Sequence, residues 1–251
     1  MNNNTKPFVS IVIPCYNEEK WIEKTVTAAL AQDYSDFEIV LVNNASIDNT
    51  QNVLLELQKK HSDKIKVVEE PRQGVLMARE AGRVAATGEI IGCLDADCIP
   101  PKNWISRAVP YFSDPTIIAV AGSYDYYDAS FWQRYKTLLL LIIFMRPINF
   151  LIQKFKKRAA FLGGNIFIRA ETLRKADGYN KVTTFYGDEI DTASRIVPYG
   201  FLVSMPWLIV KTSARRYKAF GFKQAQEKYD LSAWSALKKN IIRMNETIHP
   251  R

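Results

Sequence analysis

Apolar residues in the first hundred positions alternate between short continuous runs and runs spaced three or four residues apart. The continuous runs predict buried strands at Val9–Ile13, Glu38–Val42, Ile65–Val68 and Ile90–Leu94. The spaced runs predict helices at Glu18–Ala31, Asn49–Lys60 and Gly74–Thr87. Strands that alternate with helices and are apolar along their whole length predict an α/β fold, with a mostly parallel sheet covered by helices on both faces.

The second half of the chain is less regular. Further strands are predicted at Ile117–Gly122, Gly200–Pro206 and Leu208–Lys211. The stretch Gln224–Glu246 has large apolar residues at alternating spacings of three and four, namely Trp234, Leu237, Ile241 and Met244. This spacing predicts an amphipathic helix that packs on the rest of the chain.

The most apolar segment, Thr137–Ile152, leaves two interpretations open. Its core, Leu138–Met145, is followed by Arg146 and Pro147, so the segment is shorter than the roughly 20 apolar residues that span a bilayer. With the basic run Lys154–Arg158 beside it, residues 138–158 suit a helix or hairpin that contacts a membrane surface. A core or dimer-interface helix with a solvated basic end has the same pattern.

Composition narrows the class of protein. The chain has 251 residues, 47% of them hydrophobic, which excludes a disordered or fibrous protein. A formal charge of +8 predicts an anionic partner. Two histidines are too few for a histidine-based zinc site, and three cysteines without a C-x-x-C pair exclude a disulfide scaffold. The polar N-terminus has no signal-peptide pattern, so we expect a chain that starts in the reducing cytosol.

Chemistry is expected where the parallel strands end, because ligands bind there in open α/β sheets. The first strand leads into Pro14–Glu18 without G-x-G-x-x-G or a P-loop, which disfavours a dinucleotide cofactor. The second ends in Asn43–Asn44, and the side chain of Asn44 could hydrogen-bond a base edge. The fourth runs into Asp95–Asp97, whose two carboxylates can hold a hard divalent cation that completes its shell with phosphate oxygens.

Five ordered motifs between about residues 8 and 217 resemble those of the family 2 glycosyltransferases of the GT-A fold. They are Val9–Glu18, Glu38–Asp48, Gly74–Gly82 with Ala86–Glu89 and Asp95–Asp97, Gly163–Arg169 with Asp177–Tyr179, and Gly187–Asp191 with Arg195. Any one of these motifs is a weak signal, and their order makes the signal specific. The resemblance implies one domain over residues 1–251, with a nucleotide-sugar-binding half (about 8–125), an acceptor half (about 126–217) and a C-terminal amphipathic helix (218–251).

The resemblance also implies an inverting transfer of a sugar from a nucleotide-diphosphate donor, assisted by Mn²⁺ or Mg²⁺. By similarity, Asp97 would ligate the metal and Asp95 would lie near the ribose or the metal. The other donor-binding residues would be Pro14, Tyr16, Glu18 and Asn44 at the nucleoside, and Arg79, Arg215 and Arg216 at the charged diphosphate. The acceptor side would contain Gly163, Gly164 and Asn165.

A carboxylate must take the proton of the acceptor hydroxyl, and three candidates follow one another in the last motif: Asp188, Glu189 and Asp191. The family's usual Glu-Asp order is reversed here. Register favours Glu189 as the base, although its side chain is longer than the usual aspartate. A second departure is Asn43–Asn44, where the family often has two aspartates, so the base of the donor nucleotide stays open.

The family's processive synthases carry a Q-x-x-R-W motif, which this sequence lacks, so we expect transfer of a single sugar. The acceptor is expected to be a glycan or glycolipid, lipid-linked or presented at the inner face of the cell membrane. The alternatives are a nucleotidyltransferase, a non-catalytic sugar-nucleotide binder and a nucleic-acid-binding protein. The acidic loop Cys15–Glu19 argues against a triphosphate site. No nucleic acid is expected, because the basic residues are dispersed apart from Lys154–Arg158.

Overall fold

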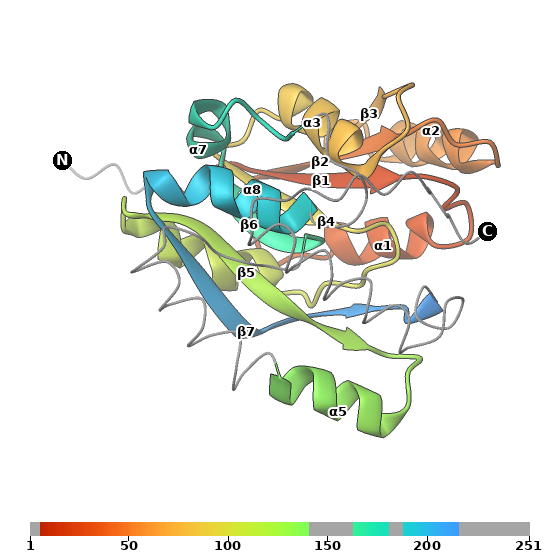
Figure 1. Cartoon of the computed structure of the whole chain (residues 1–251). Helices are drawn as coiled ribbons and strands as arrows, with labels where there is room; N and C mark the ends of the chain where they lie inside the picture. Colours follow the sequence, from red (N-terminus) through yellow and green to blue (C-terminus); the bar gives the residue numbers. More distant parts are fainter. Residues whose placement is uncertain (1–5, 141–162, 181–187, 216–251) are drawn as a thin grey trace.

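The computed structural model describes residues 6–140, 163–180 and 188–215 of the chain (Figure 1). Within these ranges, the strands form a seven-stranded sheet in the order β3-β2-β1-β4-β6-β5-β7. The strands are β1 (Val9–Cys15), β2 (Phe37–Asn43), β3 (Ile65–Glu69), β4 (Ile90–Leu94), β5 (Ile117–Tyr126), β6 (Asn165–Arg169) and β7 (Phe201–Thr212). The helices are α1 (Ile22–Leu30), α2 (Thr50–Lys60), α3 (Val75–Ala85), α4 (Trp104–Ala108), α5 (Phe131–Leu140), α7 (Ala170–Lys175) and α8 (Asp188–Ile196).

The sheet is mostly parallel, which confirms the predicted α/β class. β1 pairs in parallel with β2 and β4, β2 with β3, and β5 with β7. Only β6 among these strands runs antiparallel, and it lies between β4 and β5. The four strands predicted in the first hundred residues are each found, with ends that differ by no more than two residues.

Two apolar clusters fill the space on the two faces of the sheet. In β1, Ile11 and Ile13 belong to the cluster that also contains side chains of α1, α2 and α4. Val12 points the other way, into the cluster formed with α3, α7 and α8. Because successive side chains of a strand point to opposite faces, a strand covered on both sides needs apolar residues throughout. This is why the continuous apolar runs predicted the sheet correctly.

Some elements differ from the predicted pattern. The two short strands predicted near residues 200–211 form one strand, β7, whose pairing with β5 shifts register between Ala121 and Ser123. The pattern did not predict β6. Of the apolar segment at 137–152, residues 137–140 belong to α5 and the rest lies outside the described residues, as does the predicted helix Gln224–Glu246. No helix in the described part of the chain is long and apolar enough to cross a membrane.

The direction of β6 brings the two halves of the chain together. Because β6 is antiparallel, its first residue, Asn165, pairs with Leu94, the last residue of β4. Gly163 and Gly164 therefore lie beside the residues that follow β4, although about 70 positions separate them in sequence. This arrangement places the two glycines at the edge of the sheet where the parallel strands end.

Candidate active site

The loops after β1 and β2 are fastened to each other by hydrogen bonds. The side-chain oxygen of Asn17 accepts a hydrogen bond from the backbone N–H of Ile47 (2.9 Å), and the N–H of Glu18 donates to Oγ1 of Thr50 (2.8 Å). Asn17 and Ala45 both have positive φ angles, 55° and 56°, so each loop turns sharply where its strand ends. The two loops together form one side of the candidate site, and Glu18 lies in the first of them.

Asn44, expected in the nucleoside pocket, holds a neighbouring loop in place. Its amide nitrogen donates to the carbonyl oxygens of Glu70 (3.0 Å) and Arg72 (2.7 Å), and its amide oxygen accepts from the N–H of Gly74 (2.7 Å). Both amide hydrogens are therefore used within the protein. The side chain fixes the backbone between β3 and α3, and an effect of Asn44 on a nucleotide would act through that loop.

Asp97 lies next to the end of β7 because the loop after β4 pairs with that strand. The backbone N–H of Ile99 donates to the carbonyl oxygen of Lys211 (2.7 Å), and the N–H of Lys211 donates back (3.1 Å). Oγ1 of Thr212 then donates to Oδ1 of Asp97 at 3.4 Å. This bridge brings the residues that follow β7 to the carboxylates that follow β4.

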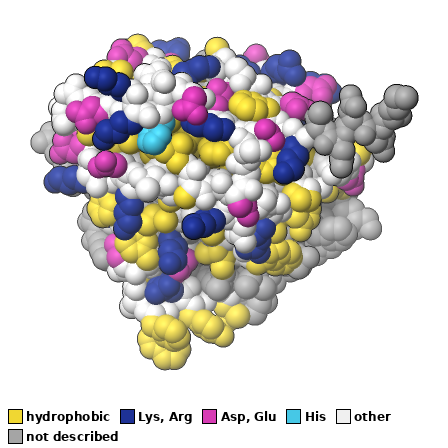
Figure 2. Space-filling model, turned by 180° about the vertical axis from the view of Figure 1, so that it is seen from behind, with side chains coloured by type: hydrophobic (Ala, Val, Ile, Leu, Met, Phe, Trp, Pro, Cys, Tyr) yellow, Lys and Arg dark blue, Asp and Glu magenta, His cyan; other side chains and the backbone are white. Residues whose placement is uncertain are grey.

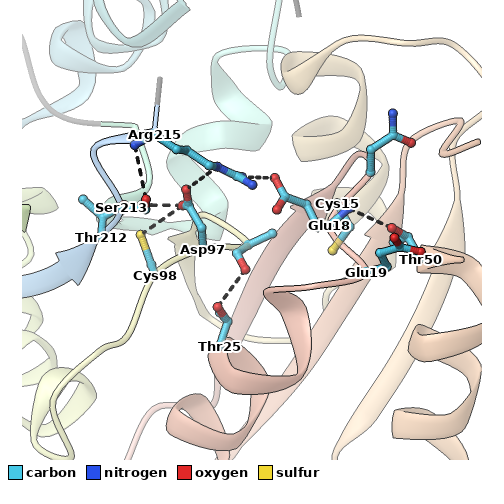
Figure 3. Close-up of polar contacts among 12 residues, drawn as sticks. Cys15, Glu18, Glu19, Thr25, Thr50, Asp97, Cys98, Thr212, Ser213 and Arg215 are labelled. Carbon is cyan, nitrogen blue, oxygen red and sulfur yellow. Dashed lines mark hydrogen bonds and ion pairs between the residues drawn. The ribbon is translucent and has the colours of Figure 1, made fainter. Parts of the chain in front are cut away.

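Arg215 joins two carboxylates that come from different strands (Figure 3). Its Nε lies 3.1 Å from Oδ2 of Asp97, and its Nη2 pairs with Oε1 of Glu18. The guanidinium also lies over the ring of Trp21, 5.6 Å from the ring centroid. The side chains of Asp97 and Glu18 are each 10% exposed, so the guanidinium of Arg215 offsets two negative charges that are largely removed from water.

Asp95 is the more open of the two carboxylates, with 29% of its side chain exposed. Arg79, which is buried in α3, places Nη2 3.4 Å from Oδ1 of Asp95. The hydroxyl of Tyr124 donates to Oδ2 at 3.2 Å. Burial, and then the charge of Asp95, raises the pKa of Tyr124 well above its usual value, so the phenol keeps the proton that it donates.

The cysteines beside these carboxylates are not candidates for nucleophiles. Cys15, Cys93 and Cys98 are free and buried. Burial raises the pKa of the Cys98 thiol well above its usual value, and the negative charges of Asp97 and Asp95 raise it further. The pKa of Cys15 is raised by burial and by Glu18. Because the thiolate is the reactive form, these thiols remain inert.

The turn Gly163–Gly164 passes close to Asp95, Arg79 and Glu189. A Cβ atom on Gly164 would lie 2.1 Å from Cγ and Oδ2 of Asp95, and 2.4 Å from the hydroxyl of Tyr124. A Cβ on Gly163 would lie 2.8 Å from Nη1 and Nη2 of Arg79, and 2.9 Å from Cγ of Glu189. The two glycines let the backbone approach Asp95, Arg79 and Glu189 closely, and they place Glu189 at this cluster.

Asn165, expected on the acceptor side, is buried and links several elements of the fold by hydrogen bonds. Its side-chain oxygen accepts from Nε1 of Trp104 (2.8 Å). Its nitrogen donates to the carbonyl oxygens of Ser123 and Leu208, both at 2.8 Å. The residue is fully buried. Its amide thus connects β6 with β5, β7 and α4, while the glycines before it reach the site.

The remaining members of the last motif have separate positions. Oδ1 of Asp191 accepts from the amide of Asn180 at 3.2 Å. Nη2 of Arg195 donates to the carbonyl oxygen of Ala176 (2.5 Å), which lies just after α7, so this arginine stabilises the end of that helix. The side chain of Asp188 and the whole of Arg216 lie outside the described residues.

Pro14 and Tyr16, the other residues expected near the nucleoside, are partly exposed at the end of β1. Three residues at the site were not predicted, namely Trp21, Tyr124 and Thr212. Trp21 directly precedes α1, Tyr124 is in β5 and Thr212 ends β7, and no spacing in the sequence connects them with Asp95 or Asp97. For Tyr124 the available signal was its place near the carboxyl end of a predicted parallel strand.

The donor set at the end of β4 fits a hard divalent cation. Asp95 and Asp97 supply carboxylate oxygens, which Mg²⁺ and Mn²⁺ prefer, and each already has a cationic side chain as its partner. Within the described ranges, no three His, Cys, Asp or Glu side chains gather into a group that could hold a metal ion. The pair suits an ion that takes few protein ligands.

Solved structures with the same arrangement define the fold. A mannosyltransferase from Pyrobaculum calidifontis, in complex with GDP-Man and Mn²⁺, superposes with a TM-score of 0.72 at 22% identity, covering 98% of this chain and 67% of that chain. Residues 1–349 of TarS from S. aureus, in complex with UDP-GlcNAc, give a TM-score of 0.61 at 16% identity, covering 82% and 58%. The fold is therefore of the GT-A type.

The sequence comparison shows the family. The model of glycosyl transferase family 2 matches residues 10–176, and the chain belongs to this family. An uncharacterized glycosyltransferase of Nostoc sp. is 35% identical over 122 residues, covering 49% of this chain and 38% of the relative. Glycosyltransferase AglE of Haloferax volcanii is 33% identical over 125 residues, covering 49% and 41%.

A third relative, from Methanococcus voltae, is 30% identical over 123 residues, covering 46% of this chain and 38% of its own length. Its name describes a glucuronosyltransferase that acts on a dolichyl N-acetyl-α-D-glucosaminyl phosphate. The matched part of the chain thus spans about two fifths of the length of these curated relatives.

Proposed function

We propose that the chain transfers one sugar, with inversion, from a nucleoside-diphosphate donor to an acceptor hydroxyl, and that it uses Mn²⁺ or Mg²⁺. The observation that carries this proposal is the pair Asp95 and Asp97, each of which contacts an arginine. The pair lies at the edge of the sheet where the loop that contains Glu18 meets the Gly163–Gly164 turn. Membership in family 2 supports it, as do neighbours of the same fold bound to GDP-Man with Mn²⁺ and to UDP-GlcNAc.

On the donor side, Asp97 and Asp95 would hold the cation. When bound, the cation neutralises the charge that develops on the departing nucleoside diphosphate. Arg79 and Arg215 add two positive charges at the same edge, where they would help to stabilise that charge. Arg79 is held by burial in α3, so its charge stays beside Asp95 whether or not a donor is bound.

On the acceptor side, Glu189 is the proposed general base. Inversion requires the acceptor hydroxyl to attack from the face opposite the leaving group, so the base must stand apart from the metal ligands. Glu189 meets this requirement, because the Gly163–Gly164 turn lies between its side chain and Asp95. Asp191 is hydrogen-bonded to Asn180 and is better suited to holding the helix. Asp188 stays as the alternative base.

The proposed acceptor is a lipid-linked or membrane-presented glycan. The Methanococcus voltae relative is named for a dolichyl phosphate-linked acceptor. The apolar run Leu138–Met145 and the basic run Lys154–Arg158 are compatible with an acceptor at an anionic membrane. With this acceptor, the chain would work as one domain at the inner face of the cell membrane.

A thermal-shift panel of UDP-, GDP- and dTDP-sugars, each with Mn²⁺ and with a chelator, tests the function. A donor present at 100 times its Kd should stabilise the fold by about 2.7 kcal/mol, and should do so only with the metal. Asp97→Asn should abolish this shift. Asp63→Asn, which changes an exposed carboxylate in the turn before β3, should retain it. A chain that no nucleotide sugar stabilises, or an Asp97→Asn variant that responds like the wild type, would contradict the proposal.

A further inference from the structure

Helix α5 leaves a group of large apolar side chains in contact with water. Phe131 is 70% exposed, Trp132 77%, Tyr135 56% and Leu139 43%. In Figure 1 the helix lies at the lower end of the molecule, beyond β5 and β7. Hydrophobic side chains protrude at the same end in Figure 2, where the molecule is seen from behind. We call these four residues the α5 stripe.

The stripe is continuous along the helix. Phe131, Tyr135 and Leu139 follow one another at intervals of four, which places them on one helix face. The rings of Phe131 and Tyr135 are stacked with centroids 6.2 Å apart, and the ring of Trp132 lies 5.8 Å from Phe131. Single exposed apolar side chains are common on protein surfaces. A contiguous patch of this kind marks an interaction surface.

The orientation of α5 is fixed by an ion pair between the helix and β5. Nε and Nη2 of Arg134 donate to the two carboxylate oxygens of Asp125 in β5, each at 2.7 Å. A bidentate pair of this geometry holds a side chain in one direction. The helix is therefore attached to the end of β5 in a way that keeps the stripe facing outward.

The stretch of sequence that contains the stripe is basic, and Asp125, which precedes it, is paired with Arg134. Residues 129–170 contain no Asp or Glu and eight basic residues, which are Arg134, Lys136, Arg146, Lys154, Lys156, Lys157, Arg158 and Arg169. An anionic surface would complement this stretch electrostatically. A second copy of the chain docked on the same face would bring two such stretches together, because a two-fold dimer uses the same patch twice. Like charges would oppose that contact.

We propose that the α5 stripe is a membrane-docking surface that enters the headgroup region of an anionic bilayer. Trp and Tyr are the side chains enriched at this depth, because their rings are apolar and their N–H or O–H group stays in water. The proposal deepens the proposed function, since it names the surface by which the enzyme would meet a membrane-presented acceptor, and it rests on that function for its purpose only.

One residue, Tyr124, contacts both the groove beside the stripe and the candidate active site. Tyr124 lines the groove under α5 together with Phe131 and Tyr135, and its hydroxyl donates to Asp95. Docking the stripe therefore brings the bilayer to the same end of β5 from which Tyr124 reaches the site. An acceptor held at the membrane would have a short path to the glycine turn.

Flotation of the full chain with liposomes tests this surface. The wild type should float with vesicles of phosphatidylcholine and phosphatidylglycerol in equal parts, and much less with phosphatidylcholine alone. The variant Phe131→Ser/Trp132→Ser/Leu139→Ser should lose about tenfold or more of the bound fraction, because it removes most of the apolar area of the stripe. The matched control is Phe201→Ser/Val84→Ser, which changes apolar side chains that are equally exposed on β7 and α3 and should float like the wild type.

The thermal shift with nucleotide sugars, measured on the same proteins, separates the two proposals. A stripe variant that keeps the donor response is folded, so its loss of flotation supports the docking surface. A wild type that floats but binds no donor contradicts the proposed function alone. A wild type that does not float, or a stripe variant that floats equally well, overturns the docking surface. If the wild type does not float but forms a dimer in gel filtration that the stripe variant loses, the stripe is an interface between two copies of the chain. That result also overturns the docking surface.

Discussion

At the scale of single residues, Arg215 and the proposed divalent cation would compete for Asp97. The guanidinium neutralises the same carboxylate that the cation would need, and it also neutralises Glu18. Without either partner, two carboxylates that are 90% shielded from water would face each other uncompensated, which is costly. On the proposed function, binding of the donor with its metal would therefore exchange one counter-ion of Asp97 for another.

Removing this competitor should strengthen metal binding in the absence of donor. We expect Arg215→Ala to bind Mn²⁺ alone about tenfold more tightly than the wild type, equivalent to about 1.4 kcal/mol. The same variant should bind the nucleotide sugar more weakly, because a charge that faces the diphosphate is gone. Isothermal titration with Mn²⁺ measures the first effect. Arg174→Ala, on the exposed side of α7, is the control, and unchanged or weaker Mn²⁺ binding by Arg215→Ala would contradict the competition.

Glu189→Gln tests the general base. We expect kcat to fall by about 10²–10⁴, because the amide cannot take the proton of the acceptor hydroxyl. The donor-induced thermal shift should stay within error of the wild type, since the base acts on the acceptor in the transition state. Asp191→Asn should have a much smaller effect on kcat. If Asp188→Asn lowers kcat in this way and Glu189→Gln does not, the base is Asp188.

The candidate residues were predicted unevenly, for a physical reason. Motif order and strand ends predicted the places of Asp95 and Asp97, and the structure puts Arg79 against Asp95, while their roles toward a donor stay predictions. The use of Asn44 and Asn165 could not be predicted, since each side chain binds backbone groups that only the folded chain brings near. A polar residue at a strand end has the same pattern whether it faces a ligand or ties loops together.

At the scale of elements, Glu38 connects β1, β2 and the loop that follows α3. Its carboxylate accepts hydrogen bonds from Oγ of Ser10 and from N and Oγ1 of Thr87, all at 2.7 Å. Burial alone would raise the pKa of Glu38. The hydrogen bonds and the charge of Lys66 outweigh burial, so the pKa of Glu38 lies below its usual value.

The pKa shift gives a pH-dependent prediction. A carboxyl group with a lowered pKa in the folded state contributes stability that is full above pH 4.5 and is lost as the pH falls through the folded pKa. Glu38→Gln should therefore lower the free energy of unfolding by about 1–3 kcal/mol at pH 7, and the difference should shrink below pH 4.5. Urea denaturation at a series of pH values measures it. Glu56→Gln, exposed on α2, should match the wild type, and a pH-independent difference would contradict the explanation.

The hydrophobic pattern of the sequence does not predict the antiparallel strand β6. Its five residues, Asn165–Arg169, are too few to distinguish a strand from a buried helix segment by periodicity. Its direction and its place between β4 and β5 depend on pairing with strands that are distant in sequence. The glycine motif before β6 could be recognised, but its contact with Asp95 needed the sheet order.

At the scale of the whole molecule, the first hundred residues could be predicted closely because each element there is local and apolar on the faces it buries. The order of the seven strands could not, since it depends on pairings across the chain. Net charge indicated an anionic partner without naming it. The structure places two arginines against Asp95 and Asp97, and the sequence has a second group of basic residues between positions 134 and 158; the sum of +8 combines the two groups.

The ion pair between Glu18 and Arg215 joins residues that are 197 positions apart. Contacts of such long range close large loops, and the entropy of closing them opposes their early formation. The sheet from β1 to β4 needs only the first part of the chain, whereas this contact needs everything up to Arg215. During synthesis, the contact between Glu18 and Arg215 would therefore form after the sheet from β1 to β4, and a chain cut short before Arg215 would lack the partner that Glu18 and Asp97 share.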